Sequence, residues 1–244
     1  MRDILSRASQ PVMEQLARER TLCAFDFDGT LSPIVEHPDQ AGMRSQTRKL
    51  LTCVAALYPC VIVSGRARQD LLAKLGGIEV ARAIGNHGAE NGSHPHGLRH
   101  EVERWKCRLS VELDALPGMW VEDKGLSLAV HYRQATEKTE ARRRILRAAR
   151  KLENVRVLGG KQVVNLIVNR SPHKGEAVAM ERDRLKCDWV LYVGDDENDE
   201  DAFGLKGDVV AVRVGRKRKS RAQFFVKTQA DVDFLLERLV RLRR

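Results

Sequence analysis

A short apolar run that ends at two carboxylates constrains this chain more than any other segment. Residues 22–25, LCAF, are followed directly by DFDGT at 26–30. A continuous apolar run of this length is typical of a strand that is covered on both faces in a parallel sheet. Ligands of such sheets bind beyond the carboxyl ends of the strands. The segment therefore predicts an α/β fold in which Asp26 and Asp28 lie at a ligand site.

The spacing of these two carboxylates indicates a cation. Asp26 and Asp28 are close enough in the chain to repel each other unless a positive charge joins them. Mg²⁺ is a hard ion that takes oxygen ligands, and it is the cofactor that we predict. The pattern Asp-x-Asp-Gly is also common in turns, because Asp and Gly favour them. For this segment alone, a phosphoryl-transfer site and a simple turn both stay open.

Three further segments place reactive groups after a predicted strand or at the start of a predicted helix. They are VSGR at 63–66, HKGEA at 173–177 and GDDEND at 194–199. Each pattern is common in loops and helix starts when it is taken alone. Together they supply a hydroxyl, a guanidinium, an ammonium group and more carboxylates. These are the groups that hydrolysis of a phosphate monoester needs.

Strands and helices alternate over most of the chain. Core strands are expected at 22–25, 60–63, 80–84, 189–193 and 209–214, and helices at 44–57, 67–75, 174–185 and 230–242. This alternation predicts a doubly wound parallel sheet. Residues 1–20 predict a short amphipathic helix. Its buried side would be formed by Ile4, Leu5, Val12, Met13 and Leu16.

Residues near 92–171 interrupt this alternation. Hairpins are expected for 119–122 with 126–132 and for 155–158 with 161–168, on either side of a helix at 136–152. The pattern predicts a small inserted α+β domain of the type ββαββ. We therefore expect residues 1–91 and 172–244 to form the parallel-sheet core and 92–171 the insert, with hinges near 91–97 and 169–173.

Composition excludes several classes of protein. The net charge is +10, but no aromatic side chains interleave the basic clusters at 142–150, 213–221 and 238–244, so a nucleic-acid partner is not expected. No apolar run approaches a membrane span, and no secretory leader is expected at the N-terminus. The 5 scattered cysteines are typical of a reduced, cytoplasmic protein. We expect a monomer that acts on a small molecule.

The order of these motifs resembles the haloacid dehalogenase superfamily of phosphatases. More narrowly, the chain resembles the trehalose-6-phosphate phosphatase family. The segments that carry this likeness are DFDGTLSPIVEHPDQA at 26–41, VSGR at 63–66, GNHGAE at 85–90, VEDKGLSLAVHYR at 121–133 and GDDENDEDAF at 194–203. The resemblance implies Mg²⁺-dependent hydrolysis of trehalose 6-phosphate to trehalose and phosphate through an aspartyl-phosphate. It also implies that the insert is a cap that closes over the sugar.

The resemblance assigns the chemistry to a few side chains. Asp26 would be the nucleophile, and Asp28 the general acid and then the base. Mg²⁺ would bind the Asp26 carboxylate, the main-chain carbonyl of Asp28 and Asp195. Ser64 and Lys174 would hold the phosphate oxygens. Behind them, waters or the lysine would be oriented by Asp196 and Asp199.

The resemblance also implies a set of substrate contacts, of which those in the cap face the sugar. The expected residues are Thr30, Gly65, Arg66, Asn86, His87, Glu122, Lys124, Arg133 and Asn165. For some of them a structural role stays open: Glu122 and Lys124 could pair with each other, His87 could be a satisfied loop histidine, and Arg133 could lie on the surface.

One position departs from the family pattern. Asn165 stands where the family usually has a glutamate that accepts hydrogen bonds from a glucose ring. Two alternatives therefore accompany trehalose 6-phosphate hydrolysis. One is the same reaction on another sugar phosphate, such as sucrose 6-phosphate. The other is a binding module without catalysis, which the presence of Asp26, Asp28, Lys174 and Asp195 disfavours.

Overall fold

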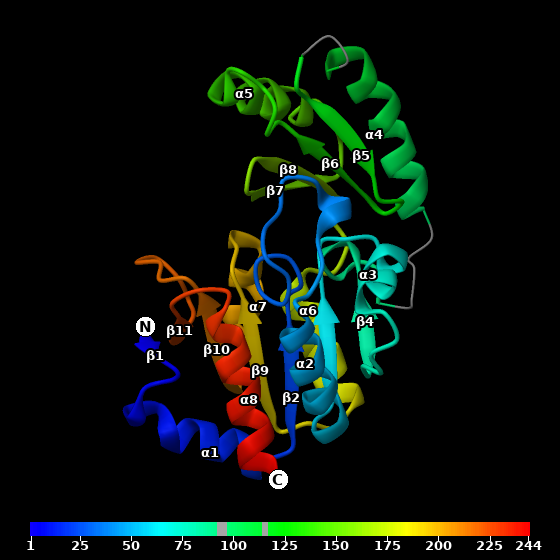
Figure 1. Cartoon of the computed structure of the whole chain (residues 1–244). Helices are drawn as coiled ribbons and strands as arrows, with labels where there is room; N and C mark the ends of the chain where they lie inside the picture. Colours follow the sequence, from blue (N-terminus) through cyan, green and yellow to red (C-terminus); the bar gives the residue numbers. More distant parts are fainter. Residues whose placement is uncertain (92–96, 114–116) are drawn as a thin grey trace.

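A computed structural model describes residues 1–91, 97–113 and 117–244. Its larger sheet has seven parallel strands in the order β1-β11-β10-β9-β2-β3-β4 (Figure 1). The strands are β1 (Arg2–Asp3), β2 (Thr21–Phe25), β3 (Cys60–Val63), β4 (Arg82–Ile84), β9 (Trp189–Gly194), β10 (Asp208–Val214) and β11 (Phe224–Val226). We call it the core sheet.

Helices cover both faces of the core sheet because successive residues of its central strand point to opposite sides. Cys23 and Phe25 pack with α1 (Gln10–Arg18), α2 (Ser45–Leu57), α3 (Arg68–Leu75) and α8 (Asp231–Arg243). Leu22 and Ala24 pack with α6 (Lys174–Arg184) and α7 (Glu200–Phe203). The predicted doubly wound parallel sheet is therefore confirmed. Within the described ranges, no helix is both long and apolar enough to cross a membrane.

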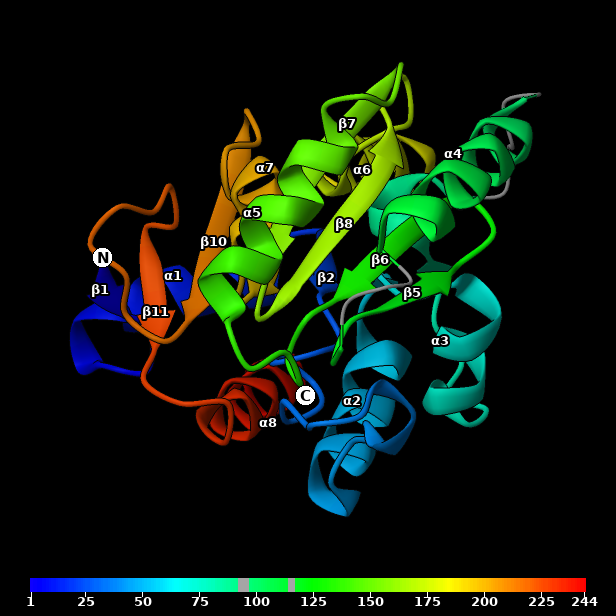
Figure 2. The ribbon, with the colours of Figure 1, turned by 90° about the horizontal axis from the view of Figure 1, so that it is seen from above.

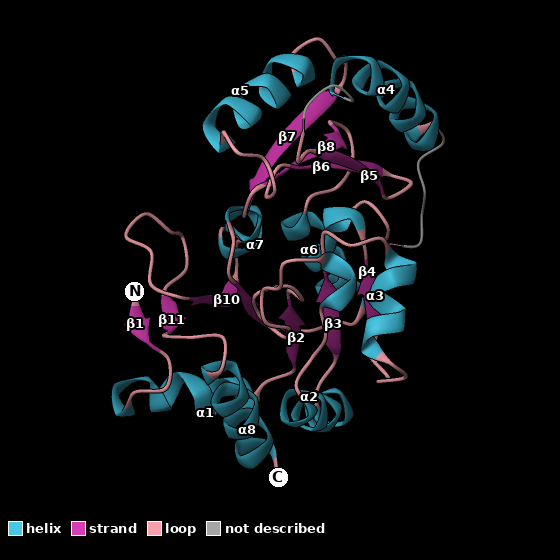
Figure 3. Ribbon diagram, turned by 45° about the horizontal axis from the view of Figure 1, so that its top comes forward, coloured by secondary structure: helices cyan, strands magenta, loops and turns pink. Residues whose placement is uncertain are grey.

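A second, antiparallel sheet lies above the carboxyl ends of the core strands. Its order is β5-β6-β8-β7, formed by β5 (Trp120–Asp123), β6 (Ser127–His131), β7 (Val155–Gly160) and β8 (Val163–Val168). Helices α4 (Leu98–Leu113) and α5 (Lys138–Ala149) cover the side turned away from the core sheet (Figures 1 and 3). Seen from above, both helices cross this outer side (Figure 2). We call residues 98–168 the antiparallel unit.

Alternation along these strands gives the antiparallel sheet two different faces. Val121, Leu128, Val130 and Leu166 belong to the apolar cluster beneath α4 and α5. Their neighbours along the strands point the other way, toward the core sheet. That second face carries Trp120, Glu122, His131 and Asn165, all of which line one cavity. The antiparallel unit therefore turns these polar groups, together with Ala129, Val163 and Ile167, toward the ends of the core strands, and we call this side its polar face.

Two predictions about secondary structure are wrong. The first helix begins at Gln10, because Arg2–Asp3 instead forms the edge strand β1 beside β11. The antiparallel unit also contains α4, so its order is αββαββ instead of ββαββ. Part of the predicted hinge near 91–97 lies outside the described residues, and the division into two domains stays a prediction.

Candidate active site

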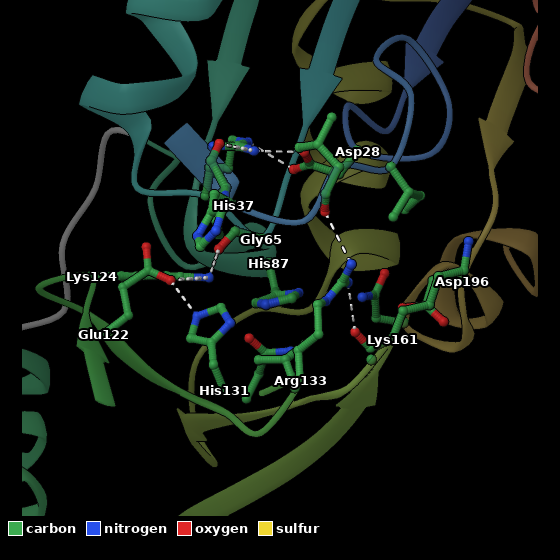
Figure 4. A pocket seen from close by; sticks show the side chains of 18 of the residues that line it. Asp28, His37, Gly65, His87, Glu122, Lys124, His131, Arg133, Lys161 and Asp196 are labelled. Atoms are coloured by element: carbon green, nitrogen blue, oxygen red, sulfur yellow. Dashed lines mark hydrogen bonds and ion pairs between the residues drawn. The ribbon is translucent and has the colours of Figure 1, made fainter. Parts of the chain in front are cut away.

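The carboxyl ends of three central core strands converge on one cavity. Asp26 follows β2, Ser64 follows β3, and Asp195 follows β9. The cavity has a volume of about 320 Å³ and lies between these strand ends and the polar face of the antiparallel unit (Figure 4). Figure 4 shows side chains from both sheets pointing into it. The core sheet supplies carboxylates, and the antiparallel unit supplies groups that can bind a polar ligand.

Most of the predicted site residues line this cavity. They are Asp26, Asp28, Gly65, Arg66, His87, Glu122, Lys124, Arg133, Asn165, Lys174, Asp195 and Asp196. The others are buried and do not line it. These are Thr30, Ser64, Asn86 and Asp199. The predicted contacts of Thr30, Ser64 and Asn86 with the substrate stay predictions.

A buried lysine holds the predicted nucleophile. Lys174 begins α6 and is only 2% exposed. Its Nζ donates to Asp26 Oδ1 at 2.7 Å and to Asp199 Oδ1 at 2.8 Å. Although burial lowers it, the charges of Asp199 and Asp26 raise the pKa of Lys174 above its ordinary value. The side chain is therefore a fixed cation at the bottom of the cavity.

Three buried carboxylates surround one point next to this lysine. Oxygens of Asp26, Asp195 and Asp199 lie within 4.8 Å of one another. Asp199 is already engaged, since it accepts from Lys174, the Tyr192 hydroxyl and the backbone N–H of Asp195. Asp26 and Asp195 are thus the carboxylates best placed to share a cation. Oxygen donors of this kind fit a hard divalent ion such as Mg²⁺.

Burial also makes both carboxylates costly to ionise. It raises the pKa of Asp26 well above its ordinary value, despite the opposing charge of Lys174. It raises the pKa of Asp195 to about 6, although Lys161 opposes the change. A bound cation would relieve this cost because it favours the ionised forms.

Asp28, the second carboxylate of DFDGT, has a different partner. Arg66 donates to it twice, from Nε to Oδ2 at 2.8 Å and from Nη2 to Oδ1 at 2.6 Å. Arg66 Nη1 also donates to Asp70 Oδ2 at 2.6 Å. The burial of Arg66 lowers its pKa, but the bonds to Asp28 and Asp70 raise it above the ordinary value overall. The residue that we predicted to bind substrate therefore contacts the predicted general acid.

The GNHGAE loop has an unusual backbone. Asn86 and His87 have φ values of 49° and 58°, in the left-handed region that non-glycine residues rarely adopt. Asn86 joins the two units: its Nδ2 donates to Lys124 O at 3.1 Å, and its Oδ1 accepts from Ser127 Oγ at 2.6 Å. Backbone strain of this kind is often found at functional sites.

His87 lines the cavity as a buried imidazole. Among the described residues Asn165 is the nearest side-chain partner of the ring, and it makes no hydrogen bond of regular geometry with either nitrogen. Burial lowers its pKa well below the ordinary value, and the charges of Lys124 and Lys174 lower it further. A Cβ on Gly65 would lie only 2.5 Å from this ring, so the glycine makes room for it. His87 is therefore neutral at neutral pH and can donate one hydrogen bond and accept another.

The polar face of the antiparallel unit contacts the core at several points. Lys124 Nζ donates to Gly65 O at 3.0 Å, and Arg133 Nη1 donates to Val35 O at 3.1 Å. Glu122 Oε2 lies 3.8 Å from Lys124 Nζ and 2.8 Å from His131 Nε2. Asp196, on the core side of the cavity, has a local partner instead: its Oδ1 accepts from the backbone N–H of Glu197 at 2.8 Å.

The sequence interpretation missed several residues that line the cavity. Among them are His37, Trp120, His131 and Lys161. Lys161 lies in the turn between β7 and β8, and its Nζ contacts Asp195 Oδ2 at 2.6 Å. Trp120 and His131 each lie two residues or fewer from a predicted site residue. The alternation of strand β5 placed Trp120 on the same face as Glu122, and that signal could have found it.

The parallel sheet with its overlying unit has the fold of phosphatases of the haloacid dehalogenase superfamily. A phosphatase of that superfamily from Bacteroides thetaiotaomicron has the same fold, with a TM-score of 0.63 at 17% identity over 92% of this chain and 95% of that one. The C-terminal domain of trehalose-6-phosphate phosphatase from Candida albicans has a TM-score of 0.77 at 23% identity, over 96% of each chain.

Sequence comparison gives the family. Residues 24–229 match the family model described as trehalose-phosphatase. The chain belongs to the trehalose-phosphatase family. It is 32% identical over 253 residues to the trehalose-phosphate phosphatase of Mycobacterium ulcerans, a match that covers 94% of this chain and 63% of that protein. The chain therefore spans less than two thirds of the length of this curated relative.

Proposed function

We propose that the chain is an Mg²⁺-dependent phosphatase that hydrolyses trehalose 6-phosphate to trehalose and phosphate. One observation carries this proposal: a single cavity joins the Asp26–Lys174 pair of the core sheet to the polar face of the antiparallel unit. The first end has the charges that a phosphoryl group needs. The second end has hydrogen-bonding groups suited to sugar hydroxyls. Membership of the trehalose-phosphatase family supports the choice of sugar.

Asp26 is the proposed nucleophile. Its oxygen attacks phosphorus in line and forms an aspartyl-phosphate, while the bond from phosphorus to the sugar oxygen breaks. Lys174 holds Asp26 in place at 2.7 Å and balances charge on the phosphoryl oxygens. Mg²⁺, held by Asp26, the carbonyl of Asp28 and Asp195, would supply further positive charge to the transferring group.

Asp28 is the proposed general acid and base. It gives a proton to the leaving sugar oxygen and later takes one from the water that attacks the aspartyl-phosphate. In this structure both carboxylate oxygens of Asp28 accept hydrogen bonds from Arg66, so neither is free to face the leaving sugar oxygen. Asp28 must therefore give up at least one bond to Arg66 before it can act as the acid.

We further propose that the antiparallel unit is a cap of residues 92–171 on a core of 1–91 and 172–244. Its sugar-binding groups would be Glu122, Lys124 and Asn165, with His87 opposite them on the core. Polar groups of this kind reject ligands that leave them unpaired. Because Asn165 lacks the charge of a glutamate, another disaccharide phosphate, such as sucrose 6-phosphate, is the second candidate substrate. A monomeric state and a cytoplasmic location stay predictions.

Phosphate release from a panel of substrates tests the proposal. The panel holds trehalose 6-phosphate, sucrose 6-phosphate, glucose 6-phosphate and an aryl phosphate, each with Mg²⁺ and with excess chelator. We expect metal-dependent preference for trehalose 6-phosphate. Preference for sucrose 6-phosphate would change the assigned substrate but not the assigned mechanism. Absence of phosphate release from every compound would favour a binding module.

Two variants test the assigned chemistry. Asp26→Asn and Asp28→Asn should both remove turnover and keep the fold, as measured by circular dichroism. Covalent phosphate on the Asp26→Asn protein, detected by mass spectrometry after acid quench, would contradict the assignment of the nucleophile. Near-normal turnover of Asp28→Asn would contradict its role as acid and base.

A further inference from the structure

An exposed tryptophan lies in the cavity among polar groups. Trp120 is 43% exposed, although its indole is among the largest apolar side chains. It lines the cavity at the start of the edge strand β5. Apolar surface left open to water costs free energy. Ligand pockets, by contrast, often combine aromatic walls with a few placed polar groups. The position of Trp120 therefore points to a ligand that covers it.

A second ring covers one face of the indole. Trp120 and His131 are opposite each other on β5 and β6, and their rings are stacked with centroids 3.9 Å apart and planes 8° from parallel. The imidazole is held in turn by Glu122, whose Oε2 lies 2.8 Å from His131 Nε2 (Figure 4). Burial raises the pKa of Glu122, but the bond to His131 and the charge of Lys124 lower it below its ordinary value overall. The stack is thus fixed by a charged group.

The pair also has the right surroundings for a sugar ring. A pyranose presents C–H groups on its faces and hydroxyls around its rim. The indole face that His131 does not cover offers an apolar surface, and Glu122 and Asn165 on the same side of the sheet offer hydrogen bonds beside it. Other apolar side chains that line the cavity are Ile34, Val35 and Pro38 from a core loop and Val163 from β8. An aromatic surface with a polar border matches both parts of a sugar.

The position of Trp120 along β5 indicates which sugar ring of a disaccharide it would contact. Lys124 reaches the core at Gly65, near the phosphate end of the cavity. Trp120 lies two residues before Glu122, or about 7 Å farther along the strand. Along β5, Trp120 is therefore farther than Glu122 from the contact of Lys124 with the core, on the side where a second sugar ring would extend.

We propose that Trp120 and His131 form a stacking surface for the sugar ring remote from the phosphate, and that this surface makes the site selective for disaccharide phosphates. The inference rests on the proposed function and adds two residues that determine specificity. Trp120 supplies the apolar contact. Glu122 holds His131 in place, and His131 packs against the other face of the indole.

Steady-state kinetics on two substrates test this inference. Trehalose 6-phosphate needs the remote site, whereas acetyl phosphate carries no ring and reports the phosphoryl chemistry alone. Trp120→Ala should lower kcat/KM for trehalose 6-phosphate about tenfold, mainly through KM, because an aromatic contact is worth about that factor. The value for acetyl phosphate should change less than about twofold, and Trp120→Phe should retain most of the activity, since it keeps a ring.

The control is Leu72→Ala, which removes another exposed apolar side chain, 42% exposed, from α3 outside the cavity. It should leave both substrates unaffected. Equal losses on both substrates for Trp120→Ala would show a structural role and overturn the inference, and so would unchanged trehalose 6-phosphate kinetics. If the wild type hydrolyses acetyl phosphate but no sugar phosphate, the proposed substrate fails and the stacking surface fails with it.

Discussion

Replacing Asp195 by asparagine is expected to raise the free energy of unfolding when no divalent cation is present. The carboxylate is only 5% exposed, and burial raises its pKa from 3.8 to about 6. Each unit of pKa corresponds to about 1.4 kcal/mol, so the charged form costs about 3 kcal/mol at pH 7. The contact with Lys161 is already included in that value. The asparagine side chain carries no charge, and we expect the Asp195→Asn variant to gain about 2–3 kcal/mol.

The gain should depend on pH in a defined direction. The pKa of Asp195 is raised in the folded state, so the folded protein takes up this proton more readily than the unfolded chain. The cost is complete above about pH 6 and disappears as the pH falls toward 3.8. The difference between variant and wild type should therefore shrink from about 3 kcal/mol at pH 7 to less than about 1 kcal/mol at pH 4.

Urea unfolding at several pH values, in chelator and in excess Mg²⁺, measures both effects. Mg²⁺ should stabilise the wild type by about 2.7 kcal/mol at 100 times its dissociation constant, and the variant much less, because Asp195 is a proposed ligand. The difference in free energy of unfolding between the variant and the wild type should therefore shrink or change sign when Mg²⁺ is added. A variant that is less stable than the wild type in chelator at pH 7 would refute the reasoning, since burial of the charge would then not be the dominant cost.

Three other variants test the same site. Lys174→Met leaves Asp26 and Asp199 buried without their cation, and urea unfolding should show a loss of about 3–5 kcal/mol; a loss below about 1 kcal/mol would contradict the role of the lysine. His87 has a lowered pKa, so the unfolded chain binds its proton first as the pH falls below 6.5. From pH 7 to 5 the wild type should thus lose up to about 2 kcal/mol more stability than His87→Gln, and equal losses would argue against a buried neutral imidazole. Gly29→Ala should cost more than about 1 kcal/mol in the same assay, because φ is +85° and a Cβ would clash with the Asp195 carboxylate; full stability and activity would show that the turn can adjust.

Much of the core could be predicted because its strands are short apolar runs with polar ends. The run at 60–63 corresponds to β3 without any change of boundary, and α6 begins at Lys174 as expected. The missed strands β1 and β11 have two and three residues, and β1 forms only by pairing with β11 at the other end of the chain. Local sequence carries little information about such a non-local pair.

The missed helix α4 did carry a signal. Its buried residues follow helical spacing: Leu98, Val102, Trp105, Leu109 and Leu113. The many charged residues between them concealed this pattern, although a solvated helix face of that kind is ordinary. In the site, the convergence of Asp26, Asp195 and Lys174 follows from strand ends and a helix start. The contact of Lys161 with Asp195 does not, because it depends on how the β7–β8 turn lies over the core.

The two carboxylates of DFDGT have partners that suit different tasks. Asp26 is buried and bound to Lys174, which is itself buried and fixed by Asp199, so the proposed nucleophile has little freedom to move. The Asp28 side chain is 37% exposed and bound only through Arg66 among the ion pairs of the described residues. A nucleophile benefits from a fixed position, whereas an acid that later acts as a base must reach two different oxygens.

Of the Arg66–Asp28 pair, Asp28 is the side chain that we expect to move. Besides Asp28, its guanidinium donates to Asp70 and to the carbonyl of Pro38, and these bonds hold it at the wall of the cavity. Rotation of Asp28 away from Arg66 therefore costs two hydrogen bonds but leaves the arginine in place. The proposed mechanism requires that rotation before the sugar oxygen can take its proton. Between the two steps, after Asp28 has given its proton to the sugar oxygen, Arg66 can bind the ionised carboxylate again, and the proton that Asp28 then takes from the attacking water restores the acid.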